Sequence, residues 1–175
     1  MRLSRLSGLQ RFVLVLGIAA VAGCQASPEQ QVKDAFRNEF RENGRRVAVM
    51  YARYMSSPTK PVTGRDGFAG PADEAELRRF IAATPSAALE EIGIKSAESA
   101  ELFASERDGQ PFRVRYGIKG PLSTTYAVLC ETKGVNGRVK VFKSDGAFVE
   151  VPADEADAHM AGKHDVAYDP TASTL

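Results

Sequence analysis

The spacing of apolar residues divides this chain into a helical first half and a strand-forming second half. Between residues 27 and 54, apolar residues recur three, four or seven positions apart, as on one face of an amphipathic helix. Ser27-Pro28 is typical of a helix start. Asn43-Gly44 predicts a kink or an end, because glycine costs about 1 kcal/mol relative to alanine inside a helix. The apolar face comprises Val32, Phe36, Phe40, Val47, Tyr51 and Tyr54.

A loop rich in proline and glycine follows at residues 56–72, and two short helices are expected after it. Asp73 and Glu76 resemble a capping pair for the first of them. Thr84-Pro85 should end that helix, because proline disfavours helical backbone in the preceding residue. Ser86 can cap the second helix, which should end at Gly93. The inward positions of the two helices are expected to be Leu77, Phe80, Ile81, Leu89 and Ile92.

From residue 102 onward the apolar period becomes two residues, as in a β-strand. The predicted strands cover residues 102–105, 112–118, 126–130, 139–143 and 147–151. The third of these is apolar on both faces and should therefore be central. Asn136-Gly137 predicts a tight hairpin turn, and Asp145-Gly146 predicts a second turn between the last two strands. Together the strands should form an antiparallel meander.

Helices followed by strands indicate an α+β fold. We expect N-terminal helices packed on one face of a four- to five-stranded antiparallel meander, with a short closing helix at residues 154–160 that ends before Gly162. Residues 30–162 should form a single domain, since this length suits one hydrophobic core. Residues 163–175 are polar and lack periodicity, so they are expected to be a flexible tail.

The N-terminus has the organisation of an export signal. Arg2, Arg5 and Arg11 make it basic, and an apolar run follows at residues 12–22. This run is too short to span a bilayer, which needs roughly 20 apolar residues. The small residues Val21-Ala22-Gly23 then lead to Cys24.

The sequence Val21-Ala22-Gly23-Cys24 resembles the lipobox of bacterial lipoproteins. The resemblance implies that diacylglycerol is attached to the thiol of Cys24 and that residues 1–23 are removed as a signal peptide. Residues 24–29 would then be the lipidated anchor and tether, with fatty acids such as palmitate holding the protein to a membrane of the cell envelope. Gln25 in place of an aspartate implies the outer membrane and a domain that faces the periplasm.

Charge and cysteine content limit the possible functions of the mature chain. Removing residues 1–23 takes away three of the 23 basic residues and leaves 20 against 22 acidic ones. The basic stripe that nucleic-acid binding requires is absent from this near-neutral mixture, so no nucleic-acid partner is expected. Of the two cysteines, Cys24 would carry lipid and Cys130 would be alone, so no internal disulfide is expected.

Few residues are candidates for chemistry, and no cofactor is expected. His159 and His164, with Asp157, Asp165 and Asp169 nearby, form the one cluster with metal-ligating groups. The histidine spacing brackets Gly162, so the two rings need not face one site, and we expect surface histidines without a metal. Cys130 lies in an apolar strand pattern, which favours a packing role over a nucleophilic one.

Arg113 and Arg115 are expected on the solvent face of their strand, two residues apart. They could dock an acidic protein partner or anionic lipid headgroups. An ordinary solvated sheet face would look the same.

A second resemblance concerns the overall layout of residues 30–160. A long N-terminal helix, a loop rich in proline and glycine, an acidic short helix and a C-terminal meander are similar to the layout of pilin-like and pseudopilin-like proteins. Residues 138–151 form a strand, an Asp-Gly turn and a strand, like the ending common in pseudopilin-like domains. This resemblance implies an α+β fold.

These features together predict a non-enzymatic lipoprotein that binds or scaffolds a protein partner in the cell envelope. One alternative is a carrier or sensor of a small apolar or lipidic ligand, in a pocket lined by Phe36, Tyr51, Phe80 and Tyr116. Another alternative is a hydrolase of unrecognised type, which would need a cleft with a histidine or paired carboxylates at hydrogen-bond distance.

Lipidation should depend on Cys24 alone. Replacing Cys24→Ser should abolish fatty-acid labelling and release the protein from membranes, because the acyl chains supply about 0.8 kcal/mol of anchoring per buried methylene. Cys130→Ser is the matched control and should keep its label. Metabolic labelling followed by membrane fractionation measures both effects, and a labelled Cys24→Ser protein would contradict the lipobox assignment.

Overall fold

A computed structural model describes residues 41–57, 68–97 and 99–167 of the chain. The predicted helix start at Ser27, the lipobox and Cys24 lie outside these ranges. Within them, no helix is both long and apolar enough to cross a membrane.

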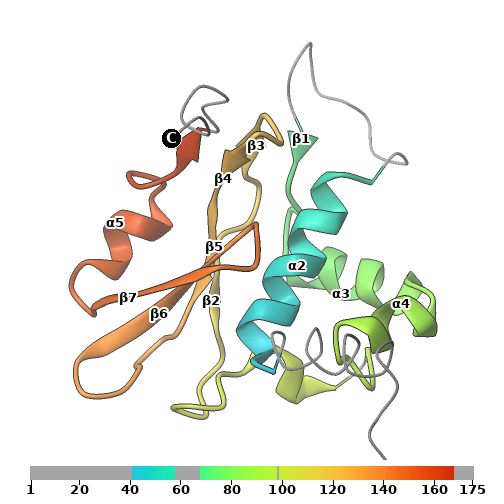
Figure 1. The fold of residues 1–175 in the computed structure, drawn as a ribbon, viewed down its shortest axis with the longest axis horizontal. Helices are drawn as coiled ribbons and strands as arrows, with labels where there is room; N and C mark the ends of the chain where they lie inside the picture. The colour runs from blue at the N-terminus through green and yellow to red at the C-terminus, as the bar shows by residue number, and fades with distance from the viewer. Residues whose placement is uncertain (1–40, 58–67, 98, 168–175) are drawn as a thin grey trace, which may run out of the picture.

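The fold is α+β, as the sequence pattern predicts (Figure 1). The helices are α2 (Asn43–Met55), α3 (Glu74–Ala83), α4 (Ser86–Glu91) and α5 (Ala156–Met160), with a 3-10 turn η1 (Ala100–Phe103). The strands are β1 (Phe68–Ala69), β2 (Arg113–Val114), β3 (Lys119–Gly120), β4 (Thr124–Thr125), β5 (Ala127–Cys130), β6 (Arg138–Lys143), β7 (Phe148–Pro152) and β8 (Val166–Ala167). An antiparallel sheet has the order β2-β5-β6-β7, and two small ribbons pair β1 with β3 and β4 with β8.

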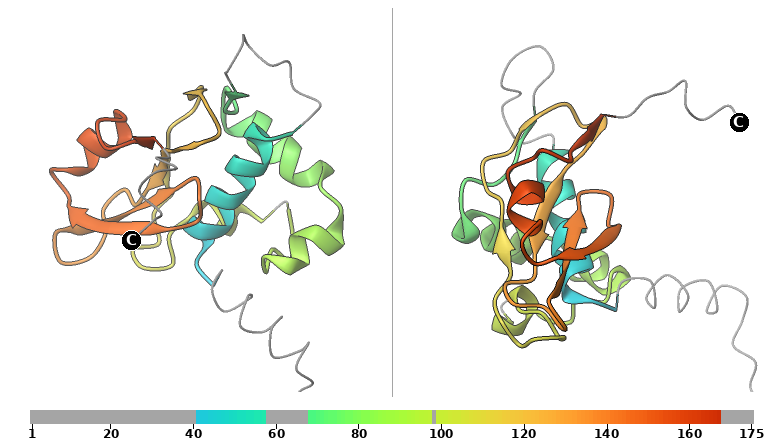
Figure 2. Two further views of the ribbon diagram at one scale, coloured as in Figure 1. Left: turned by 45° about the horizontal axis from the view of Figure 1, so that its top comes forward. Right: turned by 90° about the vertical axis from the view of Figure 1, so that its left-hand side faces the viewer.

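The sheet is covered on both faces. In β6, Phe142 belongs to the apolar cluster under α2, whereas Val139 and Val141 belong to a second cluster with Ala156 of α5. Alternation along the strand sends neighbouring side chains to opposite faces. Helices α2 and α5 therefore lie on opposite sides of the sheet, as Figures 1 and 2 show. All of β5 is buried, so its predicted central place is confirmed.

Helix α2 begins where the sequence predicts a break. Residues 41 and 42 are not helical, and the backbone N–H of Asn43 donates to a carboxylate oxygen of Glu106 at 2.8 Å. A Cβ atom on Gly44 would lie 2.3 Å from the ring of Phe142, so only glycine lets α2 approach the sheet this closely. The buried face of α2 includes Val47 and Tyr51, as its spacing predicts.

Helices α3 and α4 follow the predicted capping signals, with one exception. The N–H of Glu76 donates to the carboxylate of Asp73 at 2.8 Å, and the carboxylate of Glu76 accepts from the N–H of Ala72 at 2.8 Å. Helix α3 ends at Ala83, before Thr84-Pro85. Helix α4 begins at Ser86, but no side chain caps it.

Two predicted strands are wrong in part. Residues 102–105 overlap the 3-10 turn η1. Of residues 112–118, only β2 pairs with β5, and the chain then turns at Gly117, whose φ is 67°, into β3 of another ribbon. The alternating apolar pattern continues across this turn, because Phe112 before it and Ile118 after it both belong to the hydrophobic core. The pattern alone therefore does not locate the break.

Both predicted tight turns are confirmed. Asn136 and Gly137 have φ values of 54° and 73°, and Val135 and Arg138 exchange two backbone hydrogen bonds of 2.9 and 3.0 Å. Positive φ at both central residues is the requirement of a type I′ turn. Gly146, with φ of 82°, forms the turn between β6 and β7.

The predicted boundary of the flexible tail falls too early. Helix α5 ends before Gly162, as expected, but the chain then turns back to the domain. Val166 and Ala167 pair with Thr125 and Thr124, which makes β8 part of a ribbon. The apolar period and the composition of residues 163–167 do not predict that this segment is ordered, because a single charged side chain, Asp165, attaches it to the sheet.

Replacing Gly137→Val should lower the free energy of unfolding by about 1–2 kcal/mol, since a β-branched residue resists positive φ. No heavy atom lies within 4 Å of a Cβ built on Gly137, so the cost is conformational and not a clash. Gly137→Asn is the matched control and should cost much less, because asparagine tolerates this region. Chemical denaturation measures both variants, and equal losses would argue against the turn assignment.

Candidate functional site

The C-terminal segment is held by one carboxylate with two partners. Asp165 accepts a hydrogen bond from the guanidinium of Arg115 at 2.8 Å and another from the backbone N–H of Ala127 at 3.0 Å. Both charged side chains of this ion pair are more than three-quarters buried. We call Arg115, Asp165 and Ala127 the C-terminal clamp, because together they join β2, β5 and the segment before β8.

The prediction that Arg113 and Arg115 both face solvent is confirmed for Arg113 and wrong for Arg115. The guanidinium of Arg115 is paired with Asp165 inside the domain, in the C-terminal clamp. Arg113 is exposed, but its guanidinium contacts Asp157 of α5 at 2.5 Å. The strand pattern could not reveal these partners, because the two aspartates lie 44 and 50 residues further along the chain. Two internal ion pairs leave a less basic surface than the sequence suggests.

The two histidines are brought together by the turn at Gly162. Their rings are stacked, with centroids 4.2 Å apart and planes 29° apart. His159 is buried, which corrects the prediction that both are surface residues. Burial, followed by the neighbouring His164 and Lys143, lowers the pKa of His159 below its ordinary value. Stacking aims the ring faces at each other, so the nitrogen lone pairs do not converge on a common point.

No group of three or more histidine, cysteine, aspartate or glutamate side chains in the described ranges is placed to hold a metal ion. Asp169, a member of the candidate cluster, lies outside those ranges. Cys130 is fully buried in the central strand, and burial raises the pKa of its thiol to about 11. The predicted burial of Cys130 is confirmed, and such a thiol holds little nucleophilic thiolate at neutral pH.

The aromatic residues expected around a ligand pocket have separate packing roles. Tyr51 is fully buried, and its hydroxyl donates to the carbonyl oxygen of Arg115 at 2.7 Å. Phe80 packs edge-to-face on Tyr54, with ring centroids 5.3 Å apart. Phe36 lies outside the described residues. The rings of Tyr51 and Phe80 thus contribute to packing and do not enclose a common cavity.

Apolar side chains are exposed at one end of the molecule. Leu122, in the loop between β3 and β4, is 45% exposed, and Val166 of β8 is 56% exposed. We call this region, formed by the ribbons β1–β3 and β4–β8 and the loop at residues 121–123, the ribbon end. In Figure 1 it lies at the top of the molecule.

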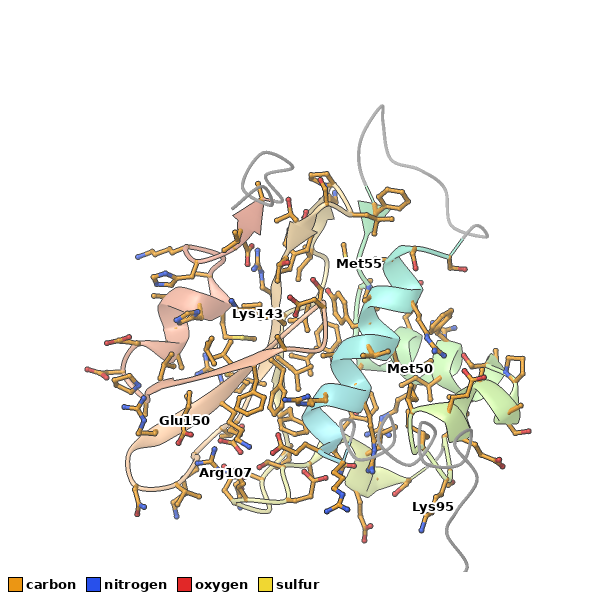
Figure 3. All side chains as sticks on the ribbon, in the orientation of Figure 1. Met50, Met55, Lys95, Arg107, Lys143 and Glu150 are labelled. Carbon is orange, nitrogen blue, oxygen red and sulfur yellow. The ribbon has the colours of Figure 1, made fainter. Side chains whose placement is uncertain are left out.

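A recess of about 130 Å³ adjoins the ribbon end. Leu122 forms part of its wall, and Met55 contributes from the last turn of α2, which Figure 3 labels near the top of that helix. The other lining residues are Ala52, Thr124, Thr125, Tyr126, Ser144 and Asp145. The recess is therefore part apolar and part hydroxyl-lined, a combination suited to receiving a side chain of another protein.

The first turn of α2 lies at the opposite end of the molecule from the ribbon end (Figure 1). Helix α2 runs from Asn43, beside η1, to Met55, beside the recess. The chain thus enters the described domain at one end and presents Leu122 and Val166 at the other. Sequence reasoning missed the ribbon end, because single apolar residues in loops carry no periodic signal.

Comparison with models of known protein families, with curated proteins and with solved structures found no match in any of the three. The lipobox and the pilin-like layout therefore stay predictions from the sequence.

The C-terminal clamp should contribute much more to stability than the exposed pair on α5. Asp165→Ala leaves the largely buried Arg115 and the N–H of Ala127 without their acceptor, so it should cost about 2–3 kcal/mol. Asp157→Ala removes the partner of the exposed Arg113 and should cost less than about 1 kcal/mol. Urea denaturation of the two variants measures the difference. Equal costs would show that the clamp is only a surface ion pair.

Proposed function

We propose that this protein is a lipid-anchored component of the bacterial cell envelope whose non-enzymatic domain binds a protein partner at the ribbon end. The observation that carries the proposal is the exposure of Leu122 in the wall of a recess that is part apolar. The exposed Val166 pairs with Thr125, another residue of that wall. Exposed apolar residues grouped around a recess are a common feature of binding surfaces, whereas single ones scattered over a surface are not.

The energetics suit a protein partner. Burying a leucine or valine side chain that was exposed contributes roughly 1.5–3 kcal/mol. Two such contacts with an inserted side chain would form the centre of a small interface. A ligand pocket for a small molecule usually measures about 300–1,000 Å³. The recess, at about 130 Å³, is below that range, so it favours a side chain over a whole ligand.

The direction in which the chain runs through the domain suits an anchored binding module. The predicted lipid attachment at Cys24 precedes α2, and α2 begins at the end of the domain remote from the ribbon end. An anchor on that side would turn the ribbon end away from the membrane surface. This placement supports a role in recruiting a partner from the periplasm.

Site-specific photo-crosslinking in the native host tests the proposal. A photo-reactive phenylalanine analogue at position 122 or 166 should give a discrete crosslinked species of higher mass. Val135 is the matched control, because it is 37% exposed but lies in the Asn136-Gly137 hairpin. The same analogue at position 135 should give no such species.

Charge substitutions test whether the surface matters for the role of the protein. Leu122→Glu and Val166→Glu should weaken partner capture at least about tenfold, because each places a charge in an apolar contact. Val135→Glu should have no effect. Crosslinking yield and complementation of a deletion strain are the measurements. Full complementation by both ribbon-end variants, with normal folding, would rule the ribbon end out as the partner site.

A further inference from the structure

The stacked histidines lie beside the C-terminal clamp. His159 is on α5, and His164 directly precedes Asp165, which holds Arg115 and the N–H of Ala127. A Cβ atom on Gly162 would lie 2.5 Å from the guanidinium of Arg115 and 2.8 Å from the carboxylate of Asp165. The turn is thus in direct contact with the clamp. The stack is joined to the clamp through the chain, because His159 and His164 flank the turn and His164 precedes Asp165, so movement of His164 relative to His159 is transmitted to Asp165 by the backbone.

The environment of His159 disfavours a positive charge. His159 is 9% exposed, and its Nδ1 atom is buried with no hydrogen-bond partner among the described residues. A proton on that nitrogen would create a buried donor without an acceptor. Two imidazolium rings 4.2 Å apart would also repel each other.

The charged groups around His159 come from several elements. Lys143 of β6 and the second ring, His164, add positive potential, whereas Glu155 and Asp165 add negative potential. Asp165 is already engaged by Arg115, and Glu155 is exposed to solvent. Strand β5, which packs against α5, contributes the thiol of Cys130. Arg113 of β2 is paired with Asp157 of α5. The larger electrostatic effects on His159 thus come from His164 and Lys143, which lower its pKa.

We propose that the His159–His164 stack is a pH-sensitive latch, which keeps the C-terminal clamp and the β4–β8 ribbon closed while His159 is neutral and releases them on acidification. Histidine is the side chain whose charge ordinarily changes between about pH 5 and 8. Charging His159 replaces a neutral stacking contact by a buried cation whose Nδ1 has no acceptor among the described residues, and the segment that connects the two histidines, residues 160–163, is short. Separation of the rings therefore pulls His164 and the adjoining Asp165 away from the sheet.

The direction of the pH effect follows from linkage. The pKa of His159 is lowered in the folded protein, so the unfolded or opened state binds the proton more tightly. The stabilisation by the neutral ring is fully present above the ordinary histidine pKa of about 6.5. It is lost progressively as the pH falls below that value toward the lowered pKa of the closed state. Opening should accordingly occur in mildly acidic conditions.

The latch is independent of the proposed function, although the two share β8. Val166 belongs to β8, so opening would also alter the ribbon end. A test that follows backbone opening directly, without any partner, separates failure of the latch from failure of partner binding.

Hydrogen exchange of the full-length protein in detergent micelles, followed by mass spectrometry, provides that test. Exchange is compared at about pH 7.5 and about pH 5 after correction for the intrinsic rate. Peptides covering residues 121–130 and 161–167 should lose about tenfold protection at the lower pH. A peptide from β6 and β7 is the internal reference and should change little.

The matched variant is His159→Phe with His164→Phe, which keeps two stacked aromatic rings but removes both imidazoles. It should stay closed at both pH values. His159→Gln with His164→Gln removes titration without adding apolar surface and should behave in the same way, which guards against a packing defect in the phenylalanine pair. The latch is overturned if the parent protein keeps its protection at the lower pH. It is equally overturned if the variants lose protection as the parent does.

Discussion

The buried carboxylate of Glu131 is the interaction on which the arrangement of the main sheet depends. Glu131 is 1% exposed, at the end of β5. Its oxygens accept hydrogen bonds of 2.9 Å from the hydroxyl of Ser105 and from the N–H of Lys140, and Arg107 lies 3.5 Å away. A buried carboxylate without such partners would cost several kcal/mol. Folding must therefore bring the loop after η1 against β5 and β6. Arg107 also pairs with Glu150 of β7 at 3.2 Å. Figure 3 labels both side chains.

That loop in turn fixes where α2 begins. Glu106 accepts the first N–H of the helix, and the side-chain amide of Asn43 donates to the carbonyl oxygen of Glu101 at 2.8 Å. Glu42, just before the helix, contacts Lys140 of β6. Polar contacts thus set the register between α2 and the sheet, while apolar burial holds the two layers together. This division is expected, because hydrophobic contacts are non-directional whereas hydrogen bonds and close ion pairs require a defined geometry.

On the opposite face of the sheet a polar contact again fixes the position of a segment, but this contact is more easily disrupted. Asp165 pairs with Arg115 there, but a stacked histidine pair lies beside this contact. Glu131 is enclosed by the sheet and the loop after η1, whereas the clamp holds only a short terminal segment. A segment with few contacts opens at lower free energy than the core of a domain. The fold therefore has a stable centre under α2 and a more easily opened margin next to its exposed apolar end.

The sequence by itself determined the α+β class, the break before α2, the capping of α3, both tight turns and the burial of Cys130. These features depend on neighbours within a few residues or on a regular apolar period, which the sequence displays directly. Only the tertiary structure decided the partners of Arg113 and Arg115, the stacking of His159 on His164, and the ordered segment through β8. Each of these joins residues through a turn or across many positions of the chain, and no local pattern encodes such a contact. The ribbon end belongs to the same group, because only the fold shows that Leu122 and Val166 stay exposed and that Leu122 lies in the wall of a recess.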